Sequence, residues 1–155
     1  MSNVLTNSQD YLREAVQLAV KNVKNGGGPF GAAIVLPNGK VYFGVNRVTA
    51  NNDPTAHAEV QAIRNACMEE NTFSLEGAVL FSSCEPCPMC LGAALWARVS
   101  NIFYAADRFD AADAGFDDAA FYVKLEEGKV AKRMVSEDAL LPFELWKSKL
   151  NRTEY

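Results

Sequence analysis

The stretch AVLFSSCEPCPMCLGAALWA, residues 78–97, has the residue pattern of a strand, a short turn and a helix. The apolar run 78–83 predicts a buried strand, and residues 88–97 predict a helix with Pro88 at its first position. Cys84, Cys87 and Cys90 lie three residues apart across this junction. Because ligands collect at strand–helix junctions of α/β sheets, the stretch indicates both the fold class and a candidate site.

The rest of the chain continues this alternation. An amphipathic helix is expected over 8–24, before three consecutive glycines, and Asn38-Gly39 predicts a hairpin between the next two strands. The other expected strands are 30–36, 40–45, 101–105 and 132–135, and the other expected helices run from 55 or 56 to 70, over 119–126 and over 138–150. We therefore predict a three-layer α/β/α fold, in which helices cover both faces of a mixed, mostly parallel five-stranded sheet.

Composition limits the classes of protein to consider. The chain has 155 residues, 49% of them apolar, which predicts one domain over 1–155. No signal peptide is evident and no apolar run approaches the ~20 residues of a membrane span, so we expect a cytoplasmic protein without a membrane partner. The net charge of −4 and the absence of a basic cluster argue against a nucleic-acid partner.

A metal site is predicted from one histidine and two cysteines. His57 is the only histidine of the chain, and Cys87 and Cys90 are placed i, i+3 in the first turn of a predicted helix. A helix N-terminus favours thiolates, which are metal ligands. Three protein ligands leave a fourth position for water, the arrangement of a catalytic zinc, whereas a structural zinc has four protein ligands. Cys84 is read as a packing neighbour.

Other readings of the cysteines stay open at this point. Cys84 as a fourth ligand would close the zinc site and favour a non-enzymatic, zinc-stabilised binding module. A redox CxxC would leave the nearby pair His57 and Glu59 without a role. An iron–sulfur cluster needs a fourth thiolate, and Cys67 is expected in the core of a helix. A disulfide scaffold is disfavoured because three of the four cysteines crowd into seven residues.

Glu59 completes a known pattern. An open zinc lowers the pKa of its water to about 7, and a nearby carboxylate that is not a ligand can then transfer protons. His57-x-Glu59 followed by PCxxC at 86–90 is the signature of zinc nucleobase deaminases. The sequence resembles the cytidine and deoxycytidylate deaminase superfamily, and within it the bacterial guanine deaminases. This resemblance rests on the segments GGPFGA (27–32), GVNRVT (44–49), NDPTAHAEV (52–60), SCEPCPMCLGA (83–93), WAR (96–98) and AADAGFDD (111–118), and on the terminal Glu154-Tyr155.

The resemblance implies a cytidine deaminase-like fold and the hydrolysis of guanine to xanthine and ammonia. It implies one zinc per chain, held by His57, Cys87 and Cys90, with water as the fourth ligand, and it makes Glu59 the proton shuttle. Further residues implied by the resemblance are Asp118 in catalysis and Asn46, Phe30, Trp96 and Tyr155 in binding the purine. It also implies a homodimer, in which the C-terminal helix and tail exchange between protomers.

Each added residue also has an ordinary structural reading. Asn46 could shape a turn, Asp118 could cap a helix, and Phe30 could be a core aromatic residue, as could Trp96. Tyr155 would ordinarily fray as the terminal residue. Alternative substrates are guanosine, cytosine or the adenosine of a tRNA, since the zinc motifs are common to the superfamily and do not determine the base.

Overall fold

The computed structural model describes residues 7–155. The helices are α2 (Ser8–Lys24), α3 (Val48–Asn51), α4 (Ala58–Glu69), α5 (Pro88–Trp96), α6 (Arg108–Asp113), α7 (Asp118–Glu126) and α8 (Leu141–Ser148). The strands are β1 (Gly31–Val35), β2 (Val41–Val45), β3 (Val79–Cys84) and β4 (Asn101–Ala106). They form a four-stranded sheet in the order β2-β1-β3-β4, in which β1 pairs antiparallel with β2 and β3, and β3 pairs parallel with β4.

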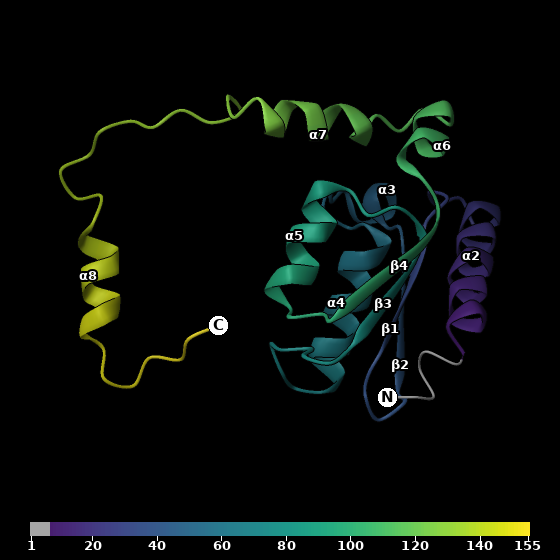
Figure 1. Cartoon of the computed structure of the whole chain (residues 1–155), viewed down its shortest axis with the longest axis horizontal. Coiled ribbons are helices and arrows are strands. Elements are labelled where there is room, and N and C mark those ends of the chain that lie inside the picture. Colours follow the sequence, from purple (N-terminus) through teal and green to yellow (C-terminus); the bar gives the residue numbers. More distant parts are fainter. Residues whose placement is uncertain (1–6) are drawn as a thin grey trace.

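Helices cover both faces of the sheet, as predicted (Figure 1). Successive side chains of a strand point to opposite faces, and β1 is buried on both. Ala32 and Ile34 pack in the cluster formed with α4 and α5. Ala33 and Val35 pack in the second cluster, where Tyr11 of α2 lies against them. The wholly apolar run of β1 is therefore explained by burial between two helical layers.

The core holds α4 close to the sheet. A methyl group on Gly44 of β2 would lie 2.2 Å from the carbonyl oxygen of Ala58 and 2.4 Å from the backbone nitrogen of Ala62. Only glycine allows this approach of helix and strand backbones. Since the first turn of α4 follows His57 directly, this contact also fixes the position of the candidate site.

The predicted mixed α/β architecture is confirmed, with two corrections. The strand expected over 132–135 is wrong, because that segment is exposed and joins no sheet: Met134 is 88% and Val135 95% exposed. The sheet is also less parallel than expected, since β3 and β4 form the one parallel pair among the described residues. The short helices α3 and α6 were not predicted.

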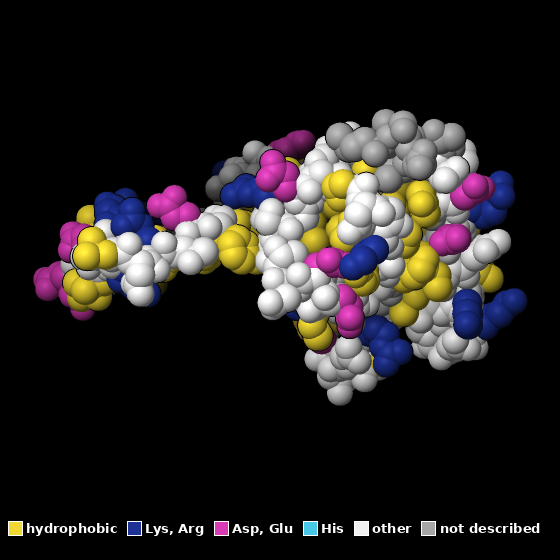
Figure 2. Space-filling model, turned by 90° about the horizontal axis from the view of Figure 1, so that it is seen from below, with side chains coloured by type: hydrophobic (Ala, Val, Ile, Leu, Met, Phe, Trp, Pro, Cys, Tyr) yellow, Lys and Arg dark blue, Asp and Glu magenta, His cyan; other side chains and the backbone are white. Residues whose placement is uncertain are grey.

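Residues 127–155 form an arm that leaves the body after α7. It carries α8 at some distance from the sheet and its helices and then turns back, so that the terminus points toward the body (Figure 1). Figure 2 shows the arm projecting from the body, with hydrophobic side chains on its surface. In α8, Phe143 is 62% and Leu145 59% exposed. Each helix among residues 7–155 is too short or too polar to span a membrane.

Candidate active site

Two helix starts supply the candidate metal ligands. His57 is the residue before α4, and Cys87 is the residue before α5. Both have extended backbone angles, as N-cap residues do, and neither side chain caps its own helix. Cys90 lies in the first turn of α5, on the side that faces α4. The fold therefore turns three side chains from two segments toward one point.

The distances between these side chains fit zinc. His57 Nδ1 lies 3.6 Å from Cys87 Sγ and 3.6 Å from Cys90 Sγ, and all three atoms lie within 4.8 Å of one another. Zinc holds nitrogen at about 2.05 Å and sulfur at about 2.3 Å, so tetrahedral geometry places such a pair about 3.6 Å apart. The predicted ligand set is thus arranged to bind this ion through Nδ1.

The pKa values of the two thiols shift in opposite directions. The pKa of Cys87 is lowered to about 4, because the Cys90 thiol donates a hydrogen bond to it and His57 lies beside it. The pKa of Cys90 is raised, because its thiol is the donor in that bond and because it is buried next to Glu59. The hydrogen bond to Cys87 raises the pKa of His57. The Cys90 thiol and His57 thus favour the thiolate form of Cys87, which is the form that binds metal.

Glu59 lies beside the ligands without belonging to them. Its side chain is buried, 5% exposed, and the Ser82 hydroxyl donates to Oε1 at 3.1 Å. The Cys90 thiol lies 3.5 Å from Oε2. Burial raises the pKa of Glu59, which favours the protonated acid. A carboxyl group with a raised pKa is suited to accept a proton and release it again near neutral pH.

Cys84 is separate from this triad. It is buried at the end of β3, and its thiol points to the backbone carbonyl of Asp107 at 3.6 Å. Burial raises the pKa of Cys84 to about 11, so the group is a neutral thiol. The triad that could hold a metal among residues 7–155 consists of His57, Cys87 and Cys90.

A cavity of about 520 Å³ opens onto the ligands. The residues that line it include His57, Glu59 and Cys87 at the metal site, together with Asn46, Phe30 and Asp118. Asp118 is partly buried at the first position of α7, and burial raises its pKa, as does the neighbouring charge of Cys87. The structure therefore brings three of the five residues added by the resemblance to the same cavity as the metal site.

Two aromatic residues of the cavity were missed. Phe116 meets Phe30 edge to face, with ring centroids 4.9 Å apart, and Phe121 of α7 lines the same wall. Phe116 lies in the stretch AGFDD, where an aromatic residue directly before two acidic residues was the available sequence signal. A flat aromatic ligand entering this space would meet apolar rings.

Asn22 is a further residue that the sequence did not reveal. Its side chain is almost fully buried at the end of α2, and Nδ2 donates to the backbone carbonyls of Gly28 at 2.8 Å and Asn46 at 2.9 Å. The Asn46 side chain accepts a hydrogen bond from the Val48 backbone N–H at 3.2 Å. These bonds fix the position of Asn46 at the cavity.

Trp96 and Tyr155 lie elsewhere in this chain. Trp96 ends α5 and is 65% exposed, with its ring 6.0 Å from that of Tyr155. The Phe73 ring also lies close to Tyr155, with ring centroids 6.4 Å apart. The three side chains line a separate shallow pocket. About 9 Å of helix separates Trp96 from Cys90, which explains why Trp96 does not reach the metal ligands.

Comparisons with known proteins agree with a zinc site of the deaminase type. Residues 5–106 match the family described as the cytidine and deoxycytidylate deaminase zinc-binding region. The chain is 45% identical over 155 residues to the guanine deaminase of Bacillus subtilis (strain 168), covering 96% of this chain and 99% of that protein. The crystal structure of a Bacillus subtilis guanine deaminase superposes with a TM-score of 0.89 at 46% identity, covering 95% of this chain and 98% of that one. A tRNA-specific adenosine deaminase of Bacillus subtilis is 36% identical over 103 residues, covering 66% of this chain and 63% of that protein.

Proposed function

The chain belongs to the cytidine and deoxycytidylate deaminase family, and from this premise we propose that it hydrolyses guanine to xanthine and ammonia. The observation that carries the proposal is the triad of zinc ligands His57, Cys87 and Cys90 beside one cavity, which His57, Cys87 and the buried Glu59 line. The similarity to a guanine deaminase over almost the full length of both chains supports guanine as the substrate.

The chemistry divides between the metal and Glu59. When bound by His57, Cys87 and Cys90, zinc supplies Lewis-acid activation of water near neutral pH. Glu59 accepts a proton from the attacking water and delivers it to the amino nitrogen on C2 of guanine. The C2–N bond then breaks and ammonia leaves with that proton, while the oxygen of water stays on C2 as a carbonyl and the second proton of water ends on the ring nitrogen N3. Because burial favours the protonated form of Glu59, the acid that must donate to the leaving group forms readily.

The cavity walls hold the purine in this proposal. Phe30 and Phe116 supply apolar contact to the ring. The Oδ1 of Asn46 is engaged by a backbone N–H, so we assign its Nδ2 to an acceptor on the purine. Asp118 of α7 lines the same cavity, and its raised pKa lets it exchange a proton with a ring nitrogen.

A substrate panel tests the proposal directly. The purified zinc-loaded protein is incubated with guanine, guanosine, cytosine and adenosine in a tRNA anticodon loop, and ammonia is measured. We expect release from guanine alone. Turnover of the tRNA without turnover of guanine would favour the adenosine deaminase alternative, for which the net charge of −4 is a poor match.

The zinc content of two cysteine variants tests the ligand set. Cys87→Ser should lose zinc, and Cys84→Ser should keep one zinc per chain, because the Cys84 thiol points to a backbone carbonyl. Loss of zinc from Cys84→Ser would instead indicate a closed structural site and a zinc-stabilised binding module. The free thiols that the site needs fit a reducing compartment, so we propose a cytoplasmic location.

We also propose a homodimer in which the arm 127–155 reaches the partner. Two features support it: α8 exposes apolar side chains, and Tyr155 lies outside the cavity of its own chain. Light scattering of the intact protein and of a form ending at residue 127 tests the assembly. If the form without the arm is still a dimer, the dimer does not depend on exchange of the arm between protomers.

A further inference from the structure

Helix α7 supplies one wall of the cavity, yet it has no buried residue. Its partly buried residues are Asp118, Ala119 and Tyr122. Asp118 and Tyr122 are spaced i, i+4, so they lie about one turn apart on the face that meets the body. Little apolar burial is available on this helix to fix Asp118, which raises the question of what holds it in place.

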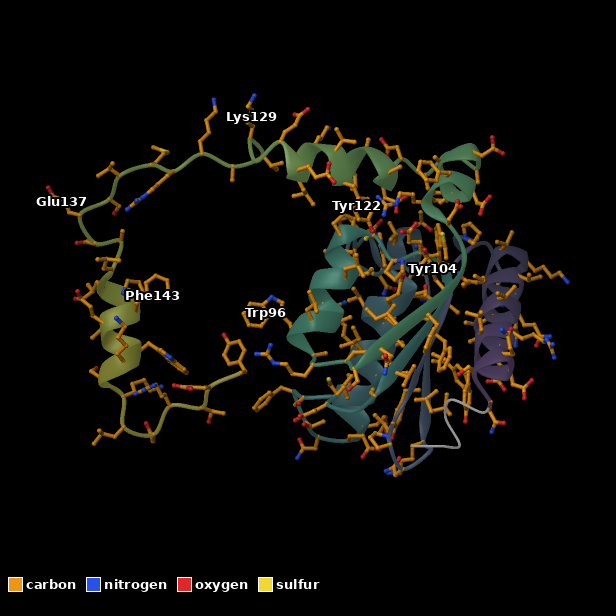
Figure 3. The ribbon with its side chains drawn as sticks, viewed as in Figure 1. Trp96, Tyr104, Tyr122, Lys129, Glu137 and Phe143 are labelled. Carbon is orange, nitrogen blue, oxygen red and sulfur yellow. The ribbon has the colours of Figure 1, made fainter. Side chains whose placement is uncertain are left out.

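Tyr122 joins α7 to the turn before α5 that carries Pro86 and Cys87, here called the metal-binding turn. Its hydroxyl donates to the backbone carbonyl of Pro86 at 2.6 Å. Figure 3 shows Tyr122 pointing from α7 toward the end of α5 where the ligands lie. Since Pro86 directly precedes Cys87, one hydrogen bond joins the helix of Asp118 to the turn of a zinc ligand.

Arg108 supports the ring of Tyr122. The guanidinium carbon lies 3.6 Å from the ring centroid, the geometry of a cation–π contact. Arg108 in turn binds Glu85: Nε lies 3.2 Å from Oε1, and Nη2 lies 2.9 Å from Oε2. The Arg108 backbone N–H also donates to Oε1 at 3.0 Å. Both oxygens of Glu85 are therefore occupied, although this carboxylate borders the cavity.

The parallel pairing of β3 and β4 brings the two charges together. Glu85 follows β3, Arg108 follows β4 by two residues, and carboxyl ends of neighbouring parallel strands lie at the same edge of a sheet. The Glu85 backbone N–H donates to the Ala106 carbonyl at 2.8 Å and continues the pairing beyond the strands. The side chains of Arg108 and Glu85 are 29% and 14% exposed, so the pair is largely shielded from water.

We propose that Glu85, Arg108 and Tyr122 form a latch that positions Asp118 across the cavity from the zinc ligands. The proposal rests on the proposed function, because it assigns Asp118 a role toward the substrate. The three latch residues are positioning residues: Glu85 is fully bonded to Arg108, and Tyr122 acts through the helix that it shares with Asp118. Polar contacts at the ends of β3 and β4 thereby hold α7, a helix that buries no side chain in the apolar core.

Tyr122→Phe tests the latch while keeping the ring on Arg108. Loss of one hydrogen bond should lower kcat/KM for guanine roughly three- to tenfold, with zinc still at one per chain. Arg108→Lys, which loses the bidentate bond and the planar stacking, should lower it further. Tyr42→Phe is the matched control, because the Tyr42 hydroxyl binds Glu70 away from the cavity, and it should change kcat/KM less than twofold.

A double-mutant cycle identifies the residue through which the latch acts. In an Asp118→Asn background, Tyr122→Phe should cost less than twofold, because the group that it positions is already impaired. An unchanged cost in that background, or loss of zinc from Tyr122→Phe, would overturn the proposal and assign the hydrogen bond to the metal-binding turn.

Hydrogen exchange supplies a readout that needs no substrate. Backbone amides of 118–126 should exchange at least several-fold faster in Tyr122→Phe, whereas those of α4 should not change. Unchanged exchange in α7 refutes the latch, even if the double variant turns over too slowly to assay. A wild-type protein that releases no ammonia from guanine refutes the proposed function instead, and the exchange comparison still decides on the latch.

Discussion

Replacing Glu59 by glutamine separates proton transfer from metal binding. Glutamine has nearly the same shape as the carboxyl group, and its carbonyl oxygen can accept the hydrogen bond that Ser82 now donates at 3.1 Å. Its amide N–H₂ can donate toward Cys90 Sγ, which lies 3.5 Å from Oε2. Since both neighbours keep a partner, we expect the free energy of unfolding to change by less than about 1 kcal/mol.

The effect on turnover should be much larger. Glutamine cannot accept the proton of water, so kcat should fall by about 10²–10⁴, the range of general acid–base catalysis. At 1.36 kcal/mol per factor of ten, this is a loss of about 2.7–5.4 kcal/mol of transition-state stabilisation. We expect a loss toward the upper end of this range, because Glu59 is buried and bulk water has poor access to take over its proton transfer.

Three measurements on Glu59→Gln test this reasoning: ammonia release from guanine, zinc per chain, and thermal unfolding. Ser82→Ala is the control, since it keeps the carboxyl group and removes only one of its donors, and it should lose less than about tenfold in kcat. A Glu59→Gln protein that retains zinc and works within tenfold of the wild type would refute the proton-shuttle role. Joint loss of zinc and activity would show that Glu59 maintains the metal site instead.

Three further changes test the framework around the site. Gly44→Ala should lower the free energy of unfolding in urea by about 1–3 kcal/mol, because the added methyl group would lie 2.2 Å from the backbone of α4. Gly92→Ala is the control, since its methyl group meets open space, and it should not lower the free energy of unfolding. Equal stabilities would contradict the close approach. Asn22→Ala should raise KM for guanine several-fold and lower the melting temperature, since two carbonyls lose their donor, and an unchanged KM would remove Asn22 from the site. The hydrogen bond from Tyr42 lowers the pKa of Glu70 below its ordinary 4.5. The extra stability of the wild type over Glu70→Gln in urea titrations should therefore be largest above pH 4.5 and shrink as the pH falls. Extra stability that grows on acidification would contradict the lowered pKa.

The metal site was predictable because its signals are local in sequence. Cys87 and Cys90 are held together by one helical turn, and His57 and Glu59 by two positions at the start of another helix. The structure had to add only the packing of the two helices against each other. Residue types and spacing therefore sufficed for the ligand set and the reaction class.

Features that depend on distant pairing were not predictable. The bond of Arg108 to Glu85 requires the register of β3 and β4, and the place of Phe116 requires the packing of the segment before α7 on Phe30. Residues 132–135, Lys-Arg-Met-Val, contain a single β-branched residue, and a strand also needs a sheet edge to pair with, which this segment does not reach. Trp96 lies six residues after Cys90, and the rise of α5 over those residues carries its side chain away from the metal ligands.

The two walls of the cavity differ in what a substitution there would disturb. The metal wall is built from the first turns of α4 and α5, whose following residues form the core, so changes there threaten folding and chemistry together. The opposite wall, residues 115–121, belongs to segments without a buried side chain. Selection for a different aminated ring can therefore vary the two aromatic residues of this wall, Phe116 and Phe121, while Asp118 is kept and the latch holds α7 in place. A library randomised at Phe116 and Phe121 should yield altered substrate preference among variants that still fold.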